Sequence, residues 1–288
     1  MGTSSAYKGP GGNTPLVPSW LGSPDHNSDL PKPVLPSDDT SALYPPIPPN
    51  RPAIPVPADQ DRFTRARNDF TRFVHSGGTD HANLGRAISS YISTSSGGVR
   101  LAAQRMGSSR ATSVRLLSFL VNAQTHGAKE ALSTLNLEIL AGRSIDEVFI
   151  GLADFICPNS GTIDDGIARE AFIETLIELV EQEITDLDAM TPEQMQIVFE
   201  IYATHAIEAR ICNDIGTKII MAPANEQVAL NVQEQLRDFI RNGVSDAFTV
   251  ARAEMPTLTH NQVNAFVDLV YERAFKILQA LGEVEAGK

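Results

Sequence analysis

The chain has 288 residues, 42% of them hydrophobic, and a formal net charge of −12. This length and apolar content allow one or two domains with hydrophobic cores, and they exclude a chain that is disordered throughout. Two cysteines exclude a disulfide framework, and no apolar run approaches the roughly 18 residues of a membrane-spanning helix, so we expect a cytoplasmic protein with no membrane contact.

The first 60 residues predict a disordered proline-rich tail. Fourteen of the eighteen prolines lie here, and proline disrupts a helix because it lacks a backbone N–H. We divide this tail into an N-terminal recognition peptide, residues 1–21, and a proline-rich disordered linker, residues 22–60. The linker is expected to be an extended spacer, and a PxxP ligand role for YPPIPPNRP is the alternative. The start MGTSSA does not match the myristoylation pattern, because alanine stands where serine or threonine is required.

From Asp61 the pattern changes to helical periodicity. Phe63, Phe70 and Phe73 fall near one face of a helix that should end at Gly77-Gly78. Residues 61–135 are predicted as a basic helical lobe, because residues 62–129 hold ten Lys or Arg against two acidic residues. Three further helices, separated by glycine-containing breaks, are expected in the segments HANLGRAISSYIS, VRLAAQRM and ATSVRLLSFLVNAQTHG.

Residues 136–288 predict an acidic helical bundle, since residues 131–288 hold 26 acidic and ten basic side chains. Capping boxes, in which two side chains satisfy free amides at a helix start, are predicted at Ser144–Glu147, Thr191–Gln194 and Thr259–Gln262. The expected helices cover residues 144–157, about 162–184, 191–215, 225–254 and 260–281. Strand patterns are nearly absent, so the predicted fold class is all-α, an irregular helical bundle preceded by the disordered proline-rich N-terminal tail.

The best candidate for site chemistry is the segment ATHAIEARICND, which places His205, Glu208 and Cys212 on one helical face. Nitrogen, oxygen and sulfur donors could contribute to a zinc site, but one helix supplies only part of a ligand shell. The favoured interpretation is a structural histidine–carboxylate pair beside a small buried cysteine. We therefore expect no metal and no cofactor.

No motif of an enzyme class is recognisable in the chain. Acid pairs such as Asp164-Asp165 lie at helix starts or in loops, where they favour the helix dipole or are solvated. Phosphate-binding loops of the GxxxxGK[ST] and GxGxxG types and the GxSxG nucleophile motif are absent from the sequence. We expect a protein that is not an enzyme and has no catalytic residues.

Five arginines of the basic segment could contact phosphates, since almost no acidic residues accompany them. In this alternative the protein is a nucleic-acid-binding adaptor that acts through helices 61–129. The other interpretation is docking on the acidic C-terminal helices or on an acidic partner, and few aromatic side chains are present for stacking on bases. The five residues are Arg86, Arg100, Arg105, Arg110 and Arg115.

Several segments resemble the QatB family of bacterial Qat antiphage defence systems. They are MGTSSAYKGPGGNTPLVPSW with the proline-rich tract, RFTRARNDFTRFVHSGG, RMGSSRA and ITDLDAMTPEQMQIVFEIYATHAIEARICNDIG. The resemblance runs from the first residue to about Gly216 and more loosely to the end. It implies a component of a defence complex that works beside a QueC-like enzyme (QatC type), an ATPase (QatA type) and possibly a TatD-like nuclease.

The resemblance also directs attention to the N-terminus, because QueC-type enzymes use ATP to activate a carboxylated deazapurine and form a carbon–nitrogen bond. Removal of Met1 would expose the α-amine of Gly2, whose pKa of about 8 leaves a neutral fraction at cytoplasmic pH. We therefore hypothesise that Gly2 is the acceptor of a modification by the QueC-like partner. Residues expected to be recognised by that enzyme are Thr3, Ser4, Ser5, Tyr7, Leu16, Val17 and Trp20.

Overall fold

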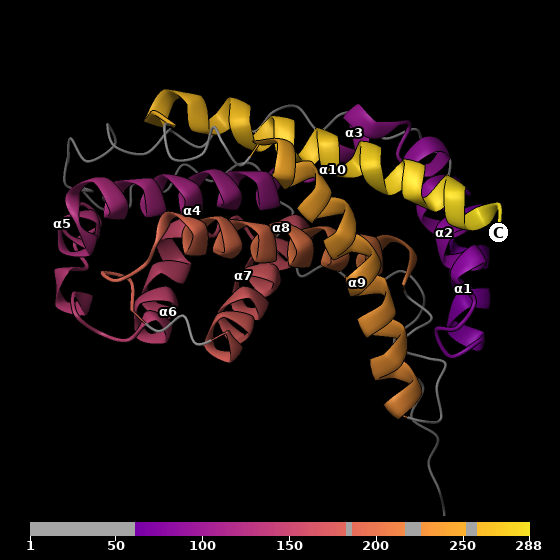
Figure 1. Ribbon diagram of the computed structural model, residues 1–288, viewed down its shortest axis with the longest axis horizontal. Coiled ribbons are helices and arrows are strands. Elements are labelled where there is room, and N and C mark those ends of the chain that lie inside the picture. Colours follow the sequence, from indigo (N-terminus) through magenta and orange to yellow (C-terminus); the bar gives the residue numbers. More distant parts are fainter. Residues whose placement is uncertain (1–60, 183–185, 217–225, 252–257) are drawn as a thin grey trace, which may run out of the picture. The chain divides into compact units, whose positions relative to one another are not determined.

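The computed structural model describes residues 61–182, 186–216, 226–251 and 258–288. The predicted tail of residues 1–60, including Gly2 and the recognition peptide, lies outside the described residues. All regular elements in the described ranges are helices, and no strand occurs in them, which confirms the all-α fold class (Figure 1). None of the helices in these ranges combines the length and the apolar character that crossing a bilayer requires.

The basic segment folds into helices separated by glycine-containing breaks, as predicted, but the helix Gly107–His126 has 20 residues and is not short. Glycines with positive φ stand at the breaks, including Gly77, Gly98 and Gly127, because glycine adopts this backbone region without a steric penalty. The second predicted helix ends in a turn of π-helix, and the fourth begins at Gly107, four residues before the expected start. The elements are α1 (Thr64–His75), α2 (His81–Ser90), η3 (Tyr91–Ser95), α3 (Val99–Gln104), α4 (Gly107–His126) and α5 (Ala128–Ser133).

The acidic segment contains the three longest of the described helices, with 24 to 26 residues each. A 3-10 turn, η6, precedes the last helix, which continues to Ala286, five residues beyond the expected end. The elements are η4 (Glu138–Leu140), α6 (Ile145–Ile156), α7 (Ile163–Glu181), α8 (Pro192–Ile215), α9 (Glu226–Ala251), η6 (His260–Gln262) and α10 (Val263–Ala286).

Helix capping follows the sequence at Thr191 but not at Ser144. The Thr191 Oγ1 accepts a hydrogen bond from the Gln194 N–H at 3.2 Å, and the Gln194 Oε1 accepts one from the Thr191 N–H at 2.8 Å. The predicted box at Ser144 is wrong, because the Ser144 hydroxyl donates to the Glu147 carboxylate at 3.3 Å and no side chain caps the backbone there. The Ser144 side chain accepts no hydrogen bond from the first turn of α6.

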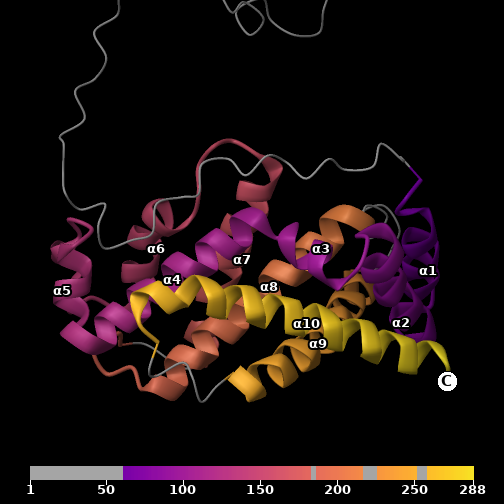
Figure 2. The same ribbon diagram turned by 90° about the horizontal axis from the view of Figure 1, so that it is seen from above.

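The helices share one continuous core. Helix α10 packs along α2 and α9 and also contacts α3 and α4, while α7 packs on α8 and on α4 (Figures 1 and 2). Phe199 of α8, Phe248 of α9 and Phe266 of α10 form an aromatic cluster with ring centroids 5.2 to 6.2 Å apart. Helices before residue 135 therefore pack on helices after it. The division into a basic lobe of residues 61–135 and an acidic bundle stays a prediction.

Two glycines allow α2 and α10 to approach at backbone distance. A Cβ atom on Gly85 would stand 2.6 Å from the carbonyl oxygen of Gly282, and a Cβ on Gly282 would stand 2.7 Å from the carbonyl oxygen of Gly85. Real Cβ atoms do not come this close to backbone oxygen. Helices α2 and α10 can therefore cross this closely only because glycine, which has no Cβ atom, stands at both positions.

Candidate functional site

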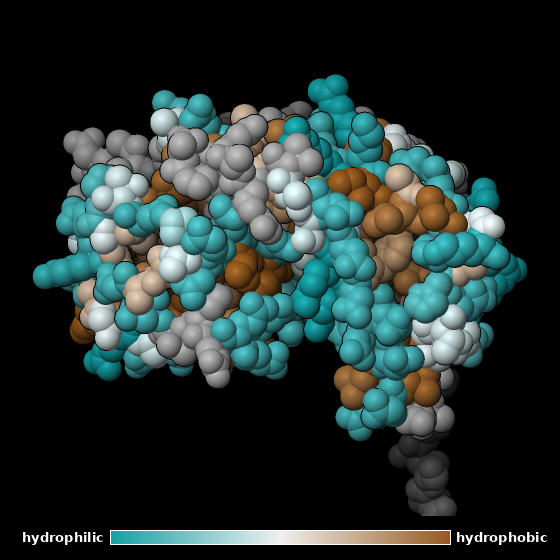
Figure 3. Space-filling view, in the orientation of Figure 1, coloured by the Kyte–Doolittle hydropathy of each residue, from teal (hydrophilic) through white to brown (hydrophobic). Residues whose placement is uncertain are grey.

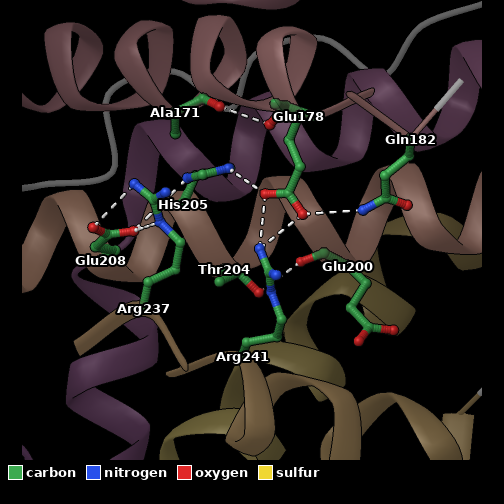
Figure 4. A network of polar contacts seen from close by, with 10 residues as sticks. Ala171, Glu178, Gln182, Glu200, Thr204, His205, Glu208, Arg237 and Arg241 are labelled. Carbon is green, nitrogen blue, oxygen red and sulfur yellow. Dashed lines mark hydrogen bonds and ion pairs between the residues drawn. The ribbon is translucent and has the colours of Figure 1, made fainter. Parts of the chain in front are cut away.

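A buried ionic network joins α7, α8 and α9. His205 of α8, with 3% of its side chain exposed, lies between two carboxylates (Figure 4). Its Nε2 is 3.0 Å from Oε2 of Glu178 on α7, and its Nδ1 is 3.8 Å from Oε2 of Glu208, one turn further along α8. The His205–Glu208 pair predicted from the sequence is thus present, and Glu178 joins it from another helix.

Two arginines of α9 complete this network. The Nε of Arg237 donates to Oε2 of Glu208 at 2.8 Å, and the Nη2 of Arg241 donates to both Glu178 oxygens at 2.7 Å. Hydrogen bonds to charged groups are about twice as strong as those between neutral groups. The arrangement therefore fixes the mutual position of the three helices and gives a cation to both the buried Glu208 and the partly buried Glu178.

The network shifts the pKa of its members in opposite directions. Burial alone would lower the pKa of His205, but its contacts with Glu178 and Glu208 outweigh burial and hold the pKa above the ordinary value of 6.5. Burial alone would raise the pKa of Glu178 and of Glu208. The hydrogen bonds with His205 and the charges of Arg241 and Arg237 outweigh that effect, so both carboxyl pKa values lie below 4.5.

These shifts predict how His205 contributes to stability at different pH. A raised pKa in the folded state stabilises the protein below the unfolded value of 6.5, and this contribution disappears as pH rises through the folded pKa. We expect the melting temperature of the wild type to exceed that of His205→Gln most at about pH 6 and to approach it toward about pH 9. Thermal unfolding of both proteins across this range measures the difference, and a gap that does not change with pH would contradict a charged His205.

The network is not arranged as a metal centre. The described residues contain no group of three or more His, Cys, Asp or Glu side chains placed to hold a metal ion. Burial raises the pKa of Cys212 to about 12 and that of Cys157 to about 11, so both thiols are protonated at neutral pH. Cys212 is half-buried, whereas a buried cysteine was expected. The arrangement is suited to holding helices together.

The acid pair at the start of α7 is also engaged within the fold. Asp164 forms an ion pair with Arg210 of α8. Burial would raise the pKa of Asp165, but hydrogen bonds from Ser160 and Ser108 outweigh it and lower the pKa to about 2. Asp165 also caps α7 together with Thr162. These carboxylates anchor the start of a helix, and they do not form an acid–base pair.

Two of the five candidate phosphate-binding arginines contact the last helix. Arg110 of α4 pairs with Asp268 of α10. Arg86 of α2 donates to the carbonyl oxygen of Ala286 at 3.4 Å, close to the end of α10. Both contacts agree with the interpretation in which the basic segment docks on the acidic C-terminal helices.

The other three arginines differ in their surroundings. Arg105 donates to the carbonyl oxygen of Ser95 at 3.3 Å, and Arg115 donates to that of Ile156 at 3.2 Å, where it caps the end of α6. Arg100 is exposed. The five arginines thus have different surroundings, and nucleic-acid binding stays a prediction.

Sequence reasoning missed Glu178, Arg237 and Arg241, the three residues that surround the His205–Glu208 pair. Each lies on a different helix from His205, and between 27 and 63 residues separate the paired side chains. A local signal existed only for His205 and Glu208, which share a helical face. The others could have been found only with knowledge of how α7, α8 and α9 pack.

Comparison with known proteins gives one family match. The model of a family described as QatB, Qat anti-phage system associated protein QatB, matches residues 97–278. The match spans α3 to most of α10 and includes every residue of the ionic network. No curated protein and no solved structure matches the chain.

Proposed function

The chain belongs to the QatB family of Qat anti-phage system associated proteins. On this premise we propose that the protein is a non-enzymatic component of the defence complex. We further propose that a QueC-like partner enzyme modifies the amine of its Gly2. Membership of the family makes the protein a component of a Qat antiphage system. The modification is our inference from the resemblance and from the start of the chain. Gly2 lies outside the matched residues, so the proposal requires a direct test.

The observation that carries the proposal is the Met1-Gly2 start in a protein of this family. Methionine is removed before a small residue, and glycine then offers an α-amine with no side chain to crowd it. At a pKa of about 8, roughly a tenth of this amine is neutral at pH 7. Thr3, Ser4, Ser5 and Tyr7 would bind the enzyme as an extended peptide. Leu16, Val17 and Trp20 would supply an apolar anchor.

The proposed reaction forms an amide bond. The carboxylate of a deazapurine attacks the α-phosphorus of ATP, pyrophosphate leaves, and an acyl adenylate forms. The neutral nitrogen of Gly2 then attacks the carbonyl carbon of this adenylate. The bond from that carbon to the activating nucleotide breaks, AMP leaves, and the nitrogen loses one proton to solvent. The reaction therefore requires from this chain only an accessible primary amine.

In this proposal the helical body is an assembly module. It would hold the QueC-like enzyme or the ATPase while the N-terminus reaches an active site. The ionic network of His205, Glu178, Glu208, Arg237 and Arg241 supports this role because it locks α7, α8 and α9 in one arrangement. Rigid surfaces lose little entropy when a partner binds.

Mass spectrometry after co-expression with the QueC-like enzyme tests the modification. We expect a discrete mass addition on the tryptic peptide of residues 2–8, and no addition when the enzyme is left out. Lys8→Arg should keep the addition, since the proposal uses the α-amine and not the nearest lysine. Gly2→Leu, which retains Met1, should lose it. An unmodified Gly2 with and without the enzyme would refute the proposal.

The nucleic-acid adaptor function is the alternative, but the internal contacts of Arg86, Arg105, Arg110 and Arg115 do not favour it. A labelled oligonucleotide that binds the full chain and is released by added salt would favour this alternative.

A further inference from the structure

Exposed apolar side chains gather on one part of the described surface. Seven of the nine large hydrophobic side chains that are exposed among the described residues lie in η4, α6 and α7. Figure 3 shows a mainly hydrophilic surface in which apolar areas are confined to patches. Isolated exposed apolar residues are normal on a protein surface, whereas a contiguous group marks an interaction site.

The outward side of α7 forms a regular stripe, which we call the α7 stripe. It consists of six residues at alternating spacings of three and four, and four of them are large and apolar. Ile163 is 72% exposed, Ile177 51%, Val180 50% and Ile173 38%. This spacing is the one by which a helix contacts a second helix in a coiled coil. The six residues are Ile163, Gly166, Glu170, Ile173, Ile177 and Val180.

Helix α6 widens the apolar surface beside the stripe. Phe149 of α6 stacks on Phe172 of α7 with ring centroids 5.4 Å apart, and Asp154 accepts a hydrogen bond from Arg169 at 2.7 Å. These contacts set an antiparallel register. Ile150 of α6, 62% exposed, lies one turn from Asp154, and Ile173 of α7 lies one turn from Arg169, so this register places both at the same level of the two helices. The stripe and Ile150 form a surface that can receive one helix.

The charge around this surface selects its occupant. From Ser144 to Glu193 the sequence contains thirteen Asp or Glu and a single basic residue, Arg169. Asp164, Asp165 and Glu178 among them are engaged within the fold. Glu170 lies within the α7 stripe, and Glu174 and Glu181 flank it. A second copy of this chain would bring like charges together, which is unfavourable. A helix with an apolar face bordered by Lys or Arg would gain from both the apolar contact and the opposite charge.

We propose that the α7 stripe, with Ile150 of α6, is a docking surface for a basic amphipathic helix of a partner protein. The proposal rests on the role of the helical body as an assembly module, and it does not depend on modification of Gly2. The apolar positions supply affinity, and the carboxylates select a basic partner and orient it.

Fluorescence anisotropy of the full-length protein with two labelled 21-residue peptides tests the proposal. One peptide carries Leu at the a and d positions and Lys elsewhere, and the other carries Glu in place of Lys. We expect the Lys peptide to bind at least tenfold more tightly than the Glu peptide. Ile173→Gln/Ile177→Gln should weaken binding of the Lys peptide at least tenfold. Leu230→Gln/Val284→Gln is the matched control, because both residues are exposed, 54% and 61%, and lie outside this surface.

Several results would overturn the proposal. Equal losses in the two double variants, or no binding of the Lys peptide at low salt, would show that the surface does not select such a helix. A dimer in sedimentation that dissociates in Ile173→Gln/Ile177→Gln would assign the surface to a second copy. A changed emission of Trp20, the chain's only tryptophan, in the same variant would assign it to the N-terminal segment. Modification of Gly2 is measured separately by mass spectrometry, so the docking proposal and the modification proposal can each fail without the other.

Discussion

Replacing Arg237 by methionine should destabilise the folded protein by about 3 kcal/mol. The substitution keeps the aliphatic part of the side chain but removes the cation that donates to Glu208 at 2.8 Å. The Glu208 side chain is only 5% exposed, so water cannot replace the lost partner. Removing one member of a buried ion pair costs more than the pair contributes, because it leaves a charge in a poorly solvated place. Urea denaturation measures the change.

A matched variant separates this effect from a general loss of charge. Arg143 pairs with Glu147 at 3.7 Å with both side chains about half exposed, 59% and 49%. Arg143→Met should change stability by less than about 0.5 kcal/mol, since solvent screens such pairs. Glu208→Gln combined with Arg237→Met should recover part of the loss, because it removes the stranded charge. Equal effects of Arg237→Met and Arg143→Met would mean that the network contributes nothing beyond a surface pair.

Replacing Gly282 by alanine should destabilise the protein by about 2–3 kcal/mol. Alanine is the better helix former by about 1 kcal/mol, but its Cβ would stand 2.7 Å from the carbonyl oxygen of Gly85 and 3.1 Å from the backbone nitrogen of Ser89. Backbone atoms cannot rotate away as a side chain can. Helices α2 and α10 must therefore move apart along their whole contact.

Gly166→Ala is the control for this substitution. Gly166 also lies within a helix, but a Cβ there would meet nothing within 4 Å. The same chemical change should stabilise the protein by about 0.5–1 kcal/mol through helix propensity. Urea denaturation of both variants tests the opposite signs, and equal signs would contradict the close approach of α2 and α10.

The sequence predicted the fold best where a local pattern determines local structure. The capping box at Thr191, with proline at the first helical position, correctly predicted where α8 begins, and Gly216 correctly predicted where it ends. Glycines with positive φ marked the breaks between the basic helices. Ser144 shows the limit of such patterns, because the right residue types were present and the hydroxyl turned to Glu147 instead.

Long-range partners could not be predicted in this way. A sequence rich in arginine suggests a phosphate-binding surface, but it does not show whether the arginine side chains are already paired with carboxylates elsewhere in the fold. Arg110 finds its carboxylate in Asp268, 158 residues away. Gly85 and Gly282 likewise gave no signal of their contact, since each appears in the sequence only as an isolated small residue. Only the packing of α10 on the first helices brings these partners together.

The position of α10 also has a consequence for biosynthesis. The final helix contacts α2, α3 and α4, and Arg86 reaches the carbonyl oxygen of Ala286 across 200 residues of chain. During translation α2, α3 and α4 emerge long before α10 exists, so the parts of their apolar faces that α10 covers have no native partner until α10 has been made. Nascent chains with such late closure rely on chaperones against aggregation. Deletion of α10 would therefore leave apolar surface of α2, α3 and α4 exposed in the newly made chain.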